Sequence, residues 1–163
     1  NVGKRFAQMC DALGLKILIF SKTFDKIKNE FPNYISSDLN KILKDADIIS
    51  FHCKPNLDGS PIISAKEIAI MKNNVLIINT ARGNLVSEID LNDAIKNNTI
   101  GGVALDVFEE EPAKNNILFG LENVLLTPHI AASTSEAQVI VAEMIANQFV
   151  DFFLKNKVNN SVI

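Results

Sequence analysis

Three side chains that could carry acid–base chemistry follow three different apolar runs of this sequence. Arg82 comes shortly after "NVLIIN", Asp106 directly after "GGVAL", and His129 shortly after "NVLLT". An arginine can bind a carboxylate through two parallel hydrogen bonds, a histidine can carry a proton near neutral pH, and an acid can orient that histidine. Taken singly, Arg82 could be a surface ion-pair partner and His129 a helix cap. Together they indicate an active site.

The acid of this group lies in a dense acidic stretch, "ALDVFEEEP" (104–112). The stretch holds four carboxylates: Asp106, Glu109, Glu110 and Glu111. They could be metal ligands, a solvated turn, or one working acid among bystanders. The two histidines, His52 and His129, follow different apolar runs, and no compact set of ligands accompanies them. We therefore expect no metal site.

The elements that must position these residues are predicted from the apolar runs. The runs are rich in Ile, Val and Leu and lack the polar alternation of a half-exposed strand, so they predict parallel strands buried on both faces. They cover residues 15–20, 47–52, 74–79, 101–107 and 123–127. In a parallel α/β sheet, ligands bind outside the carboxyl ends of the strands, where the three candidates would meet.

Helix start signals lie between the runs and after the last one. Three sites have capping residues: Ser36, Ser37 or Asp38 before "LNKILKDA", Ser64 with Glu67, and Ser133 with Glu136 before a long terminal helix. Alternation of strands and helices predicts a doubly wound α/β sheet of the Rossmann type with right-handed crossovers.

Composition limits the remaining possibilities. The chain has 163 residues, 47% of them hydrophobic, and a formal net charge of −3. The weak negative charge gives no electrostatic attraction to nucleic acid or to an anionic membrane, and no apolar run in the sequence reaches the length of a membrane span. We interpret Cys10 and Cys53 as reduced core thiols rather than a disulfide. A soluble protein of the cytoplasm, without nucleic-acid or membrane partners, is the expectation.

Three longer segments carry a resemblance to a known family. "NTARGNLVSEIDLNDAI", "GGVALDVFEEEP" and "LLTPHIAASTSEAQ" resemble successive signature motifs of the D-isomer-specific 2-hydroxyacid dehydrogenases. "STSEAQ" is most similar to the phosphoglycerate dehydrogenase branch. The resemblance implies an oxidoreductase that transfers a hydride between a nicotinamide cofactor and a D-2-hydroxy acid or 2-keto acid, with 3-phosphoglycerate as one candidate substrate. It also implies a homodimer.

The resemblance assigns roles to the candidates. Arg82 would bind the substrate carboxylate, His129 would carry the proton, and Glu111, directly before a proline, would orient the histidine. Glu109 and Glu110 match no role, and we interpret them as solvated loop charges. His52 is interpreted as a structural histidine without a catalytic role.

The cofactor would contact residues from most of the chain. The predicted set is Asn1, Val2, Gly3, Ser21, Lys22, Cys53, Thr80, Ala81, Arg82, Asp106, His129 and Ala131. Gly3 resembles the third glycine of a dinucleotide-binding fingerprint, and Asp106 resembles the acid that accepts a hydrogen bond from the nicotinamide carboxamide. The first two glycines and the strand before them do not occur in this sequence. We therefore expect residues 1–155 to form a dinucleotide-binding domain of a longer chain, and 156–163 to return toward a separate substrate domain.

Two questions stay open. The predicted first run should end in an acid that binds the ribose hydroxyls, but the sequence has Ser21 followed by Lys22, so the cofactor is NAD or NADP. The alternative function is a dinucleotide-sensing co-regulator or binding module of the same fold without useful turnover. The related formate dehydrogenases are a further, less favoured, enzyme class.

Overall fold

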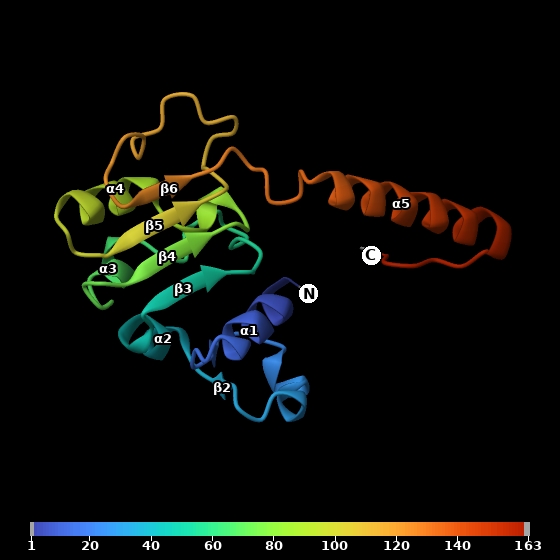
Figure 1. The fold of residues 1–163 in the computed structure, drawn as a ribbon, viewed down its shortest axis with the longest axis horizontal. Helices are drawn as coiled ribbons and strands as arrows, with labels where there is room; N and C mark the ends of the chain where they lie inside the picture. The colour runs from blue at the N-terminus through green and yellow to red at the C-terminus, as the bar shows by residue number, and fades with distance from the viewer. Residues whose placement is uncertain (1, 162–163) are drawn as a thin grey trace. The chain divides into compact units, whose positions relative to one another are not determined.

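The computed structural model describes residues 2–161, and the chain divides into two compact units, Asn1–Pro128 and His129–Ile163. The first unit contains every strand among these residues (Figure 1). The second unit contains one long helix. Each unit has its own structure, and the predicted start of a further domain at residue 156 stays a prediction.

All strands of the first unit pair in parallel. They are β1 (Leu18–Ile19), β2 (Ile35–Ser36), β3 (Ile48–Phe51), β4 (Leu76–Asn79), β5 (Gly102–Leu105) and β6 (Val124–Leu126). Every predicted run contains one strand, so the predicted α/β class is confirmed. Only β2 was not predicted, because its two residues were read as the approach to a helix cap.

The strands form a two-stranded sheet of order β1-β2 and a four-stranded sheet of order β3-β4-β5-β6. Within residues 2–161 no strand joins β1 to β3. Both orders agree with a Rossmann sheet of strand order 3-2-1-4-5-6 in which β1 corresponds to strand 2, β2 to strand 3 and β3 to strand 4. The carboxyl ends of β3 to β6 consequently lie along one edge of the larger sheet.

The helices of the first unit are α1 (Val2–Ala12), α2 (Leu39–Asp45), α3 (Ala65–Ile68) and α4 (Glu88–Lys96), with short 3₁₀ turns η1 (Phe24–Lys26), η2 (Lys28–Glu30) and η3 (Gly83–Leu85). The helices α2, α3 and α4 begin with capping residues that local chemistry favours. Asp38 caps α2 by accepting from the Lys41 N–H at 2.8 Å. The predicted capping box of Ser64 and Glu67 starts α3, with the Ser64 N–H donating to Glu67 Oε2 at 3.1 Å. Both predictions are confirmed.

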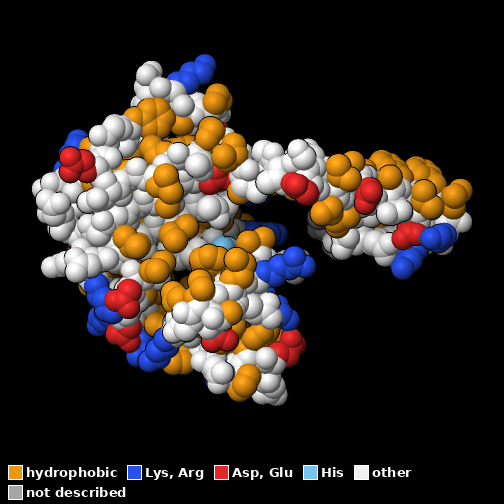
Figure 2. All heavy atoms as spheres, in the orientation of Figure 1, with side chains coloured by type: hydrophobic (Ala, Val, Ile, Leu, Met, Phe, Trp, Pro, Cys, Tyr) orange, Lys and Arg blue, Asp and Glu red, His pale blue; other side chains and the backbone are white. Residues whose placement is uncertain are grey.

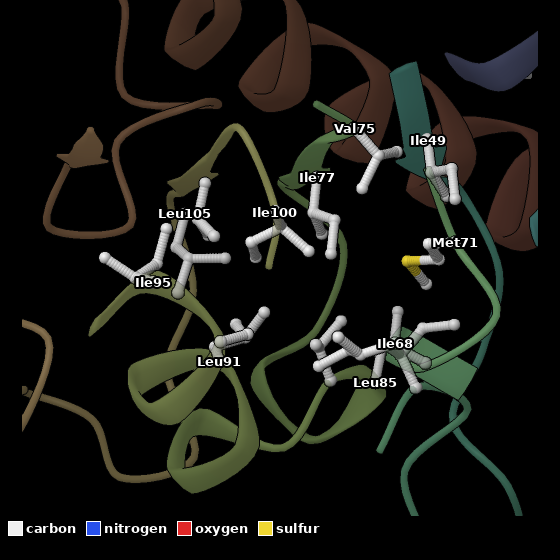
Figure 3. Packing of buried hydrophobic residues seen from close by; sticks show 14 of the residues in the cluster. Ile49, Ile68, Met71, Val75, Ile77, Leu85, Leu91, Ile95, Ile100 and Leu105 are labelled. Atoms are coloured by element: carbon white, nitrogen blue, oxygen red, sulfur yellow. The ribbon is translucent and has the colours of Figure 1, made fainter. Parts of the chain in front are cut away.

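The main core lies between the larger sheet and the helices α3 and α4 (Figure 3). Ile49 of β3 and Ile77 of β4 contribute one side, and Leu91 and Ile95 of α4 contribute another. Ile77 and Leu91 are completely buried. Burying a side chain of this size is worth roughly 1.5–3 kcal/mol each, so this packing fixes the positions of the strands that end at the candidate site. A smaller cluster of Ala7, Phe24 and Tyr34 lies apart from it.

The prediction that the strands are buried on both faces is wrong for one face of the larger sheet. Ile48, Leu76 and Leu125 are 42%, 43% and 67% exposed, whereas the alternate residues of the same strands face the core. Successive side chains of a strand point to opposite faces, and α3 and α4 pack on only one of them. An apolar run therefore predicted the strands correctly but not how many of their faces are covered.

The second unit is formed mainly by α5 (Ser135–Lys155). Its cap is Thr134, whose hydroxyl accepts from the Ala137 N–H at 3.1 Å, and not the predicted Ser133. Hydrophobic side chains lie along the helix surface (Figure 2), and none of its residues is buried. Among the described residues it is the one helix long and apolar enough to cross a membrane by length and composition. Its acids Glu136, Glu143 and Asp151 recur at intervals of seven and eight residues, which places them on one side.

Candidate functional site

The turn after β4 is built around Asn79, the last residue of that strand. Asn79 is 1% exposed, its Nδ2 donates to the Arg82 carbonyl at 2.7 Å, and its Oδ1 accepts from the Ala81 N–H at 3.1 Å. These two bonds close the turn that presents Arg82. Sequence reasoning missed Asn79, although an amide at the end of a buried strand is a usual way to satisfy the backbone groups of a turn.

Arg82 itself is exposed at the start of η3, three residues after β4 ends. Its Nη1 donates to the Ala81 carbonyl at 2.5 Å. A guanidinium has five N–H donors, so one bond to the backbone leaves others for a planar carboxylate. Thr80, the other polar residue of the turn, is also exposed.

Asp106 is held at the carboxyl end of β5. Its side chain is 4% exposed and its Oδ1 accepts from the Thr127 hydroxyl at 2.6 Å. Its backbone N–H donates to the Asn79 carbonyl at 3.0 Å. Thr127 follows β6, so Asp106 connects the ends of three neighbouring strands. Sequence reasoning placed Asp106 correctly but did not identify Thr127 as its partner.

The acidic loop, which we define as residues 107–112, follows directly. Glu111 Oε1 accepts from the Phe108 N–H at 3.0 Å while its side chain lies at the surface. Glu110 is exposed, in agreement with the interpretation as a solvated charge. Glu109 is exposed as well, in agreement with that interpretation, but its Oε1 also accepts from the Glu88 N–H at 3.0 Å. The prediction missed this backbone donor, which α4 offers because it begins next to the loop.

Gly83 brings the Arg82 turn and the acidic loop together. A Cβ on Gly83 would overlap the carbonyl group of Phe108 and come within 2.6 Å of the Glu109 nitrogen. The two backbones are therefore in direct contact, at an approach that only glycine permits. Arg82, Asp106 and the loop that carries Glu111 are thus gathered at one edge of the sheet.

The predicted nucleotide-binding residues at the start of the chain lie close to β3. Gly3 packs against His52, since a Cβ on Gly3 would come within 3.0 Å of the His52 Cβ. His52 also contacts the Phe6 ring at 5.3 Å between centroids, and its Nε2 lies 3.1 Å from the Ser50 hydroxyl. Burial lowers the pKa of His52. These contacts agree with the interpretation of His52 as a structural histidine. Val2 is exposed, and Asn1 lies outside the described residues.

The residues after β1 form an exposed polar turn. The Ser21 hydroxyl lies 3.3 Å from the Thr23 hydroxyl. Lys22, the residue between them in the sequence, is exposed. Cys53, after β3, is exposed, so the prediction of a core thiol is wrong there, while Cys10 is half-buried. Both cysteines are free, as expected.

His129 and Ala131 belong to the second unit, and both are exposed. His129 has a φ of 55°, in the left-handed region that few residues other than glycine adopt. The structure therefore assembles Arg82, Asp106 and Glu111, whereas the pairing of His129 with Glu111 stays a prediction. In the described part of the chain, no three His, Cys, Asp or Glu side chains are grouped as a metal site would require.

Comparison with known proteins shows the family of this chain. Residues 1–131 match the family described as "D-isomer specific 2-hydroxyacid dehydrogenase, NAD binding domain". The chain belongs to this family. The match includes every predicted site residue of the first unit, together with His129 and Ala131. The predicted resemblance and the Rossmann-type fold are confirmed.

Relatives of known activity are similar over most of the chain. It is 38% identical to a glyoxylate reductase of Thermococcus litoralis over 93% of its length, and 38% identical to a D-3-phosphoglycerate dehydrogenase of Methanocaldococcus jannaschii over 91%. These matches cover 46% and 28% of the two relatives. A solved acyclic imino acid reductase in complex with NADPH and D-Arg superposes with a TM-score of 0.87 at 30% identity, over 99% of this chain and 50% of that one. The chain thus spans half or less of the length of these three proteins.

Proposed function

We propose that the protein containing this chain transfers a hydride between a nicotinamide cofactor and a D-2-hydroxy acid or its 2-keto acid. The observation that carries the proposal is the contact of the Arg82 turn with the acidic loop, at the strand ends where Asp106 is buried. This contact supports the proposal because a guanidinium can bind a carboxylate through two hydrogen bonds, and the chain belongs to a dehydrogenase family. Glyoxylate and 3-phosphoglycerate are the first substrates to test, since relatives are named for them.

The residues present fit a dinucleotide. The exposed turn after β1 offers the hydroxyls of Ser21 and Thr23 and the ammonium of Lys22, and Thr80 offers a hydroxyl near the middle of the sheet. Asp106 offers a carboxylate oxygen that a carboxamide N–H can donate to. When bound, the nicotinamide supplies the acceptor or donor of the hydride.

The protein groups divide the remaining work. Arg82 binds the substrate carboxylate and orients the carbon that carries the hydroxyl. His129 takes the hydroxyl proton as the hydride leaves that carbon, and returns a proton when the keto acid is reduced. Glu111 holds one ring nitrogen of His129 and stabilises the imidazolium. The roles of His129 and Glu111 rest on the family motifs around these residues.

The test is turnover by the full-length protein with a panel of 2-keto acids, glyoxylate and 3-phosphohydroxypyruvate included, with NADH and with NADPH. Saturable turnover of at least one keto acid supports the proposal. Binding of NADH without turnover of any of them would favour the co-regulator alternative. We also propose a cytoplasmic homodimer, which light scattering of the purified protein and cell fractionation would test.

Cofactor choice is tested at the turn after β1. This turn carries hydroxyls and a lysine and no acid, so it does not repel the 2′-phosphate of NADP. Ser21→Asp should raise the preference for NADH over NADPH by like-charge repulsion, and Lys22→Ala should weaken NADPH use selectively. An unchanged ratio of kcat/KM values in both variants would show that this turn does not read the ribose.

A further inference from the structure

We propose that Glu88, the first residue of α4, is a positioning residue that holds the acidic loop in its working geometry. The proposal rests on the proposed function, because the loop carries Glu111. Glu88 is 8% exposed. The resemblance to the family assigns no role to it. A buried carboxylate is retained only where enough donors compensate its lost hydration.

Glu88 and Glu109 form a reciprocal pair of hydrogen bonds. The Glu109 N–H donates to Glu88 Oε1 at 2.8 Å, and the Glu88 N–H donates to Glu109 Oε1 at 3.0 Å. Asn116, on the far side of the loop, donates from its Nδ2 to Glu88 Oε2 at 2.6 Å. Both carboxylate oxygens of Glu88 therefore bind donors from the segment that carries the acidic loop.

The geometry requires a carboxylate at this position. A glutamine has one acceptor oxygen and would turn its NH₂ group toward either the Glu109 N–H or the Asn116 amide. Asn116 cannot rotate to accept instead, because its Oδ1 already accepts from the Leu118 N–H at 3.0 Å. Glu88→Gln therefore places a donor against a donor in a buried site, while volume and shape change little.

The start of α4 explains how two carboxylates tolerate each other here. The first N–H groups of a helix have no partner within the helix, and the helix dipole is positive at this end. Glu109 binds one of these N–H groups, that of Glu88 itself. The helix terminus thus favours both charges, and the pair becomes a fixed link between α4 and the loop.

The acidic loop held by this link has one direct contact with each part of the proposed active site. Glu111 accepts from the Phe108 N–H, and Phe108 is in backbone contact with Gly83, next to Arg82. A loop released from Glu88 would shift Glu111, whereas the Arg82 turn stays closed by its two hydrogen bonds to Asn79. Since a displacement of about 1 Å at a reacting group costs about 10²-fold in rate, even a small shift should be measurable.

The experiment uses the full-length protein with Glu88→Gln and a matched control, Glu110→Gln. Glu110 is an exposed acid of the same loop with no hydrogen bond among the described residues. We expect Glu88→Gln to lower kcat roughly 10- to 100-fold while the keto-acid KM and the Kd of NAD(P)H stay within about twofold. Glu110→Gln should match the wild type. Asn116→Ala removes one of the two donors to the Glu88 carboxylate and should give a smaller loss of kcat. It replaces Glu88→Gln as the test variant if Glu88→Gln does not fold.

Amide hydrogen exchange gives a readout independent of activity. Exchange at Glu109 and Phe108 should accelerate in Glu88→Gln and not in Glu110→Gln. A lower Tm with kcat unchanged would overturn the proposal, because Glu88 would then be structural only, as would exchange rates equal to those of the wild type. If the wild type turns over no keto acid, the proposed function fails instead, and accelerated exchange would still show that Glu88 holds the loop.

Discussion

Gly83 lies against the carbonyl group of Phe108 so closely that no side chain fits between them. The contact joins the turn that presents Arg82 to the loop that presents Glu111, although the two residues are 29 positions apart. A glycine after the arginine is therefore needed for the assembly of the site. This is a requirement of packing, and it holds whatever ligand the site binds.

Gly83→Ala should separate the two segments. We expect a loss of roughly 3 kcal/mol in the free energy of unfolding, the upper end for overpacking, and a large loss of kcat/KM. Denaturant unfolding of the full-length protein measures the first. Gly120→Ala is the control: its Cβ would meet open space, and its φ of 77° adds only the strain of a left-handed residue, about 1 kcal/mol. Equal losses in the two variants would contradict the packing argument.

Arg82→Lys keeps the positive charge but removes the planar fork. We expect kcat/KM for the keto acid to fall roughly 10²-fold, which is about 3 kcal/mol of transition-state binding. The affinity for NAD(P)H should change little, because the guanidinium would bind substrate. Steady-state kinetics and a fluorescence titration with NADH measure the two effects. Near-normal kinetics would remove Arg82 from the site.

His129→Gln should abolish most of the turnover and spare cofactor binding. Loss of a general acid–base group costs about 10²- to 10⁴-fold, and Glu111→Gln should lower kcat less, because it removes the orienting group and not the proton carrier. If the two residues act as one unit, the double variant should be no slower than His129→Gln. Multiplicative losses in the double variant would argue against the pairing.

His52 is exposed by surface area, but its partial desolvation still lowers its pKa in the folded state, which predicts a pH dependence of stability. In the unfolded chain the same side chain titrates near about 6.5. Below that pH the unfolded state binds the proton first, so stability falls as the pH drops through about 6.5 toward the folded value. Melting temperatures at pH 8 and pH 5.5 should therefore differ more in the wild type than in His52→Asn. The same difference in both proteins would contradict this origin.

The strands could be predicted from the sequence because each is a local apolar run. The predicted runs 74–79, 101–107 and 123–127 all contain strands, and the polar residues after these strands lie where parallel pairing directs them. The two-residue strand Ile35–Ser36 was missed because it is too short to form a run. The prediction that helices cover both faces was wrong for the larger sheet. Coverage depends on where helices pack and not on the sequence of the strand itself.

The sequence by itself determined every described strand except β2, two of the caps, and the candidates Arg82, Asp106 and Glu111, because apolar periodicity, capping and motif order are local properties of the chain. Only the tertiary structure decided which polar groups meet. Glu88 and Glu109 are 21 residues apart, and their two bonds form because the start of α4 lies beside the acidic loop. The same holds for Thr127 with Asp106. A hydrogen bond depends on the position of both partners within a few tenths of an ångström, and between distant segments only the packed fold sets that position.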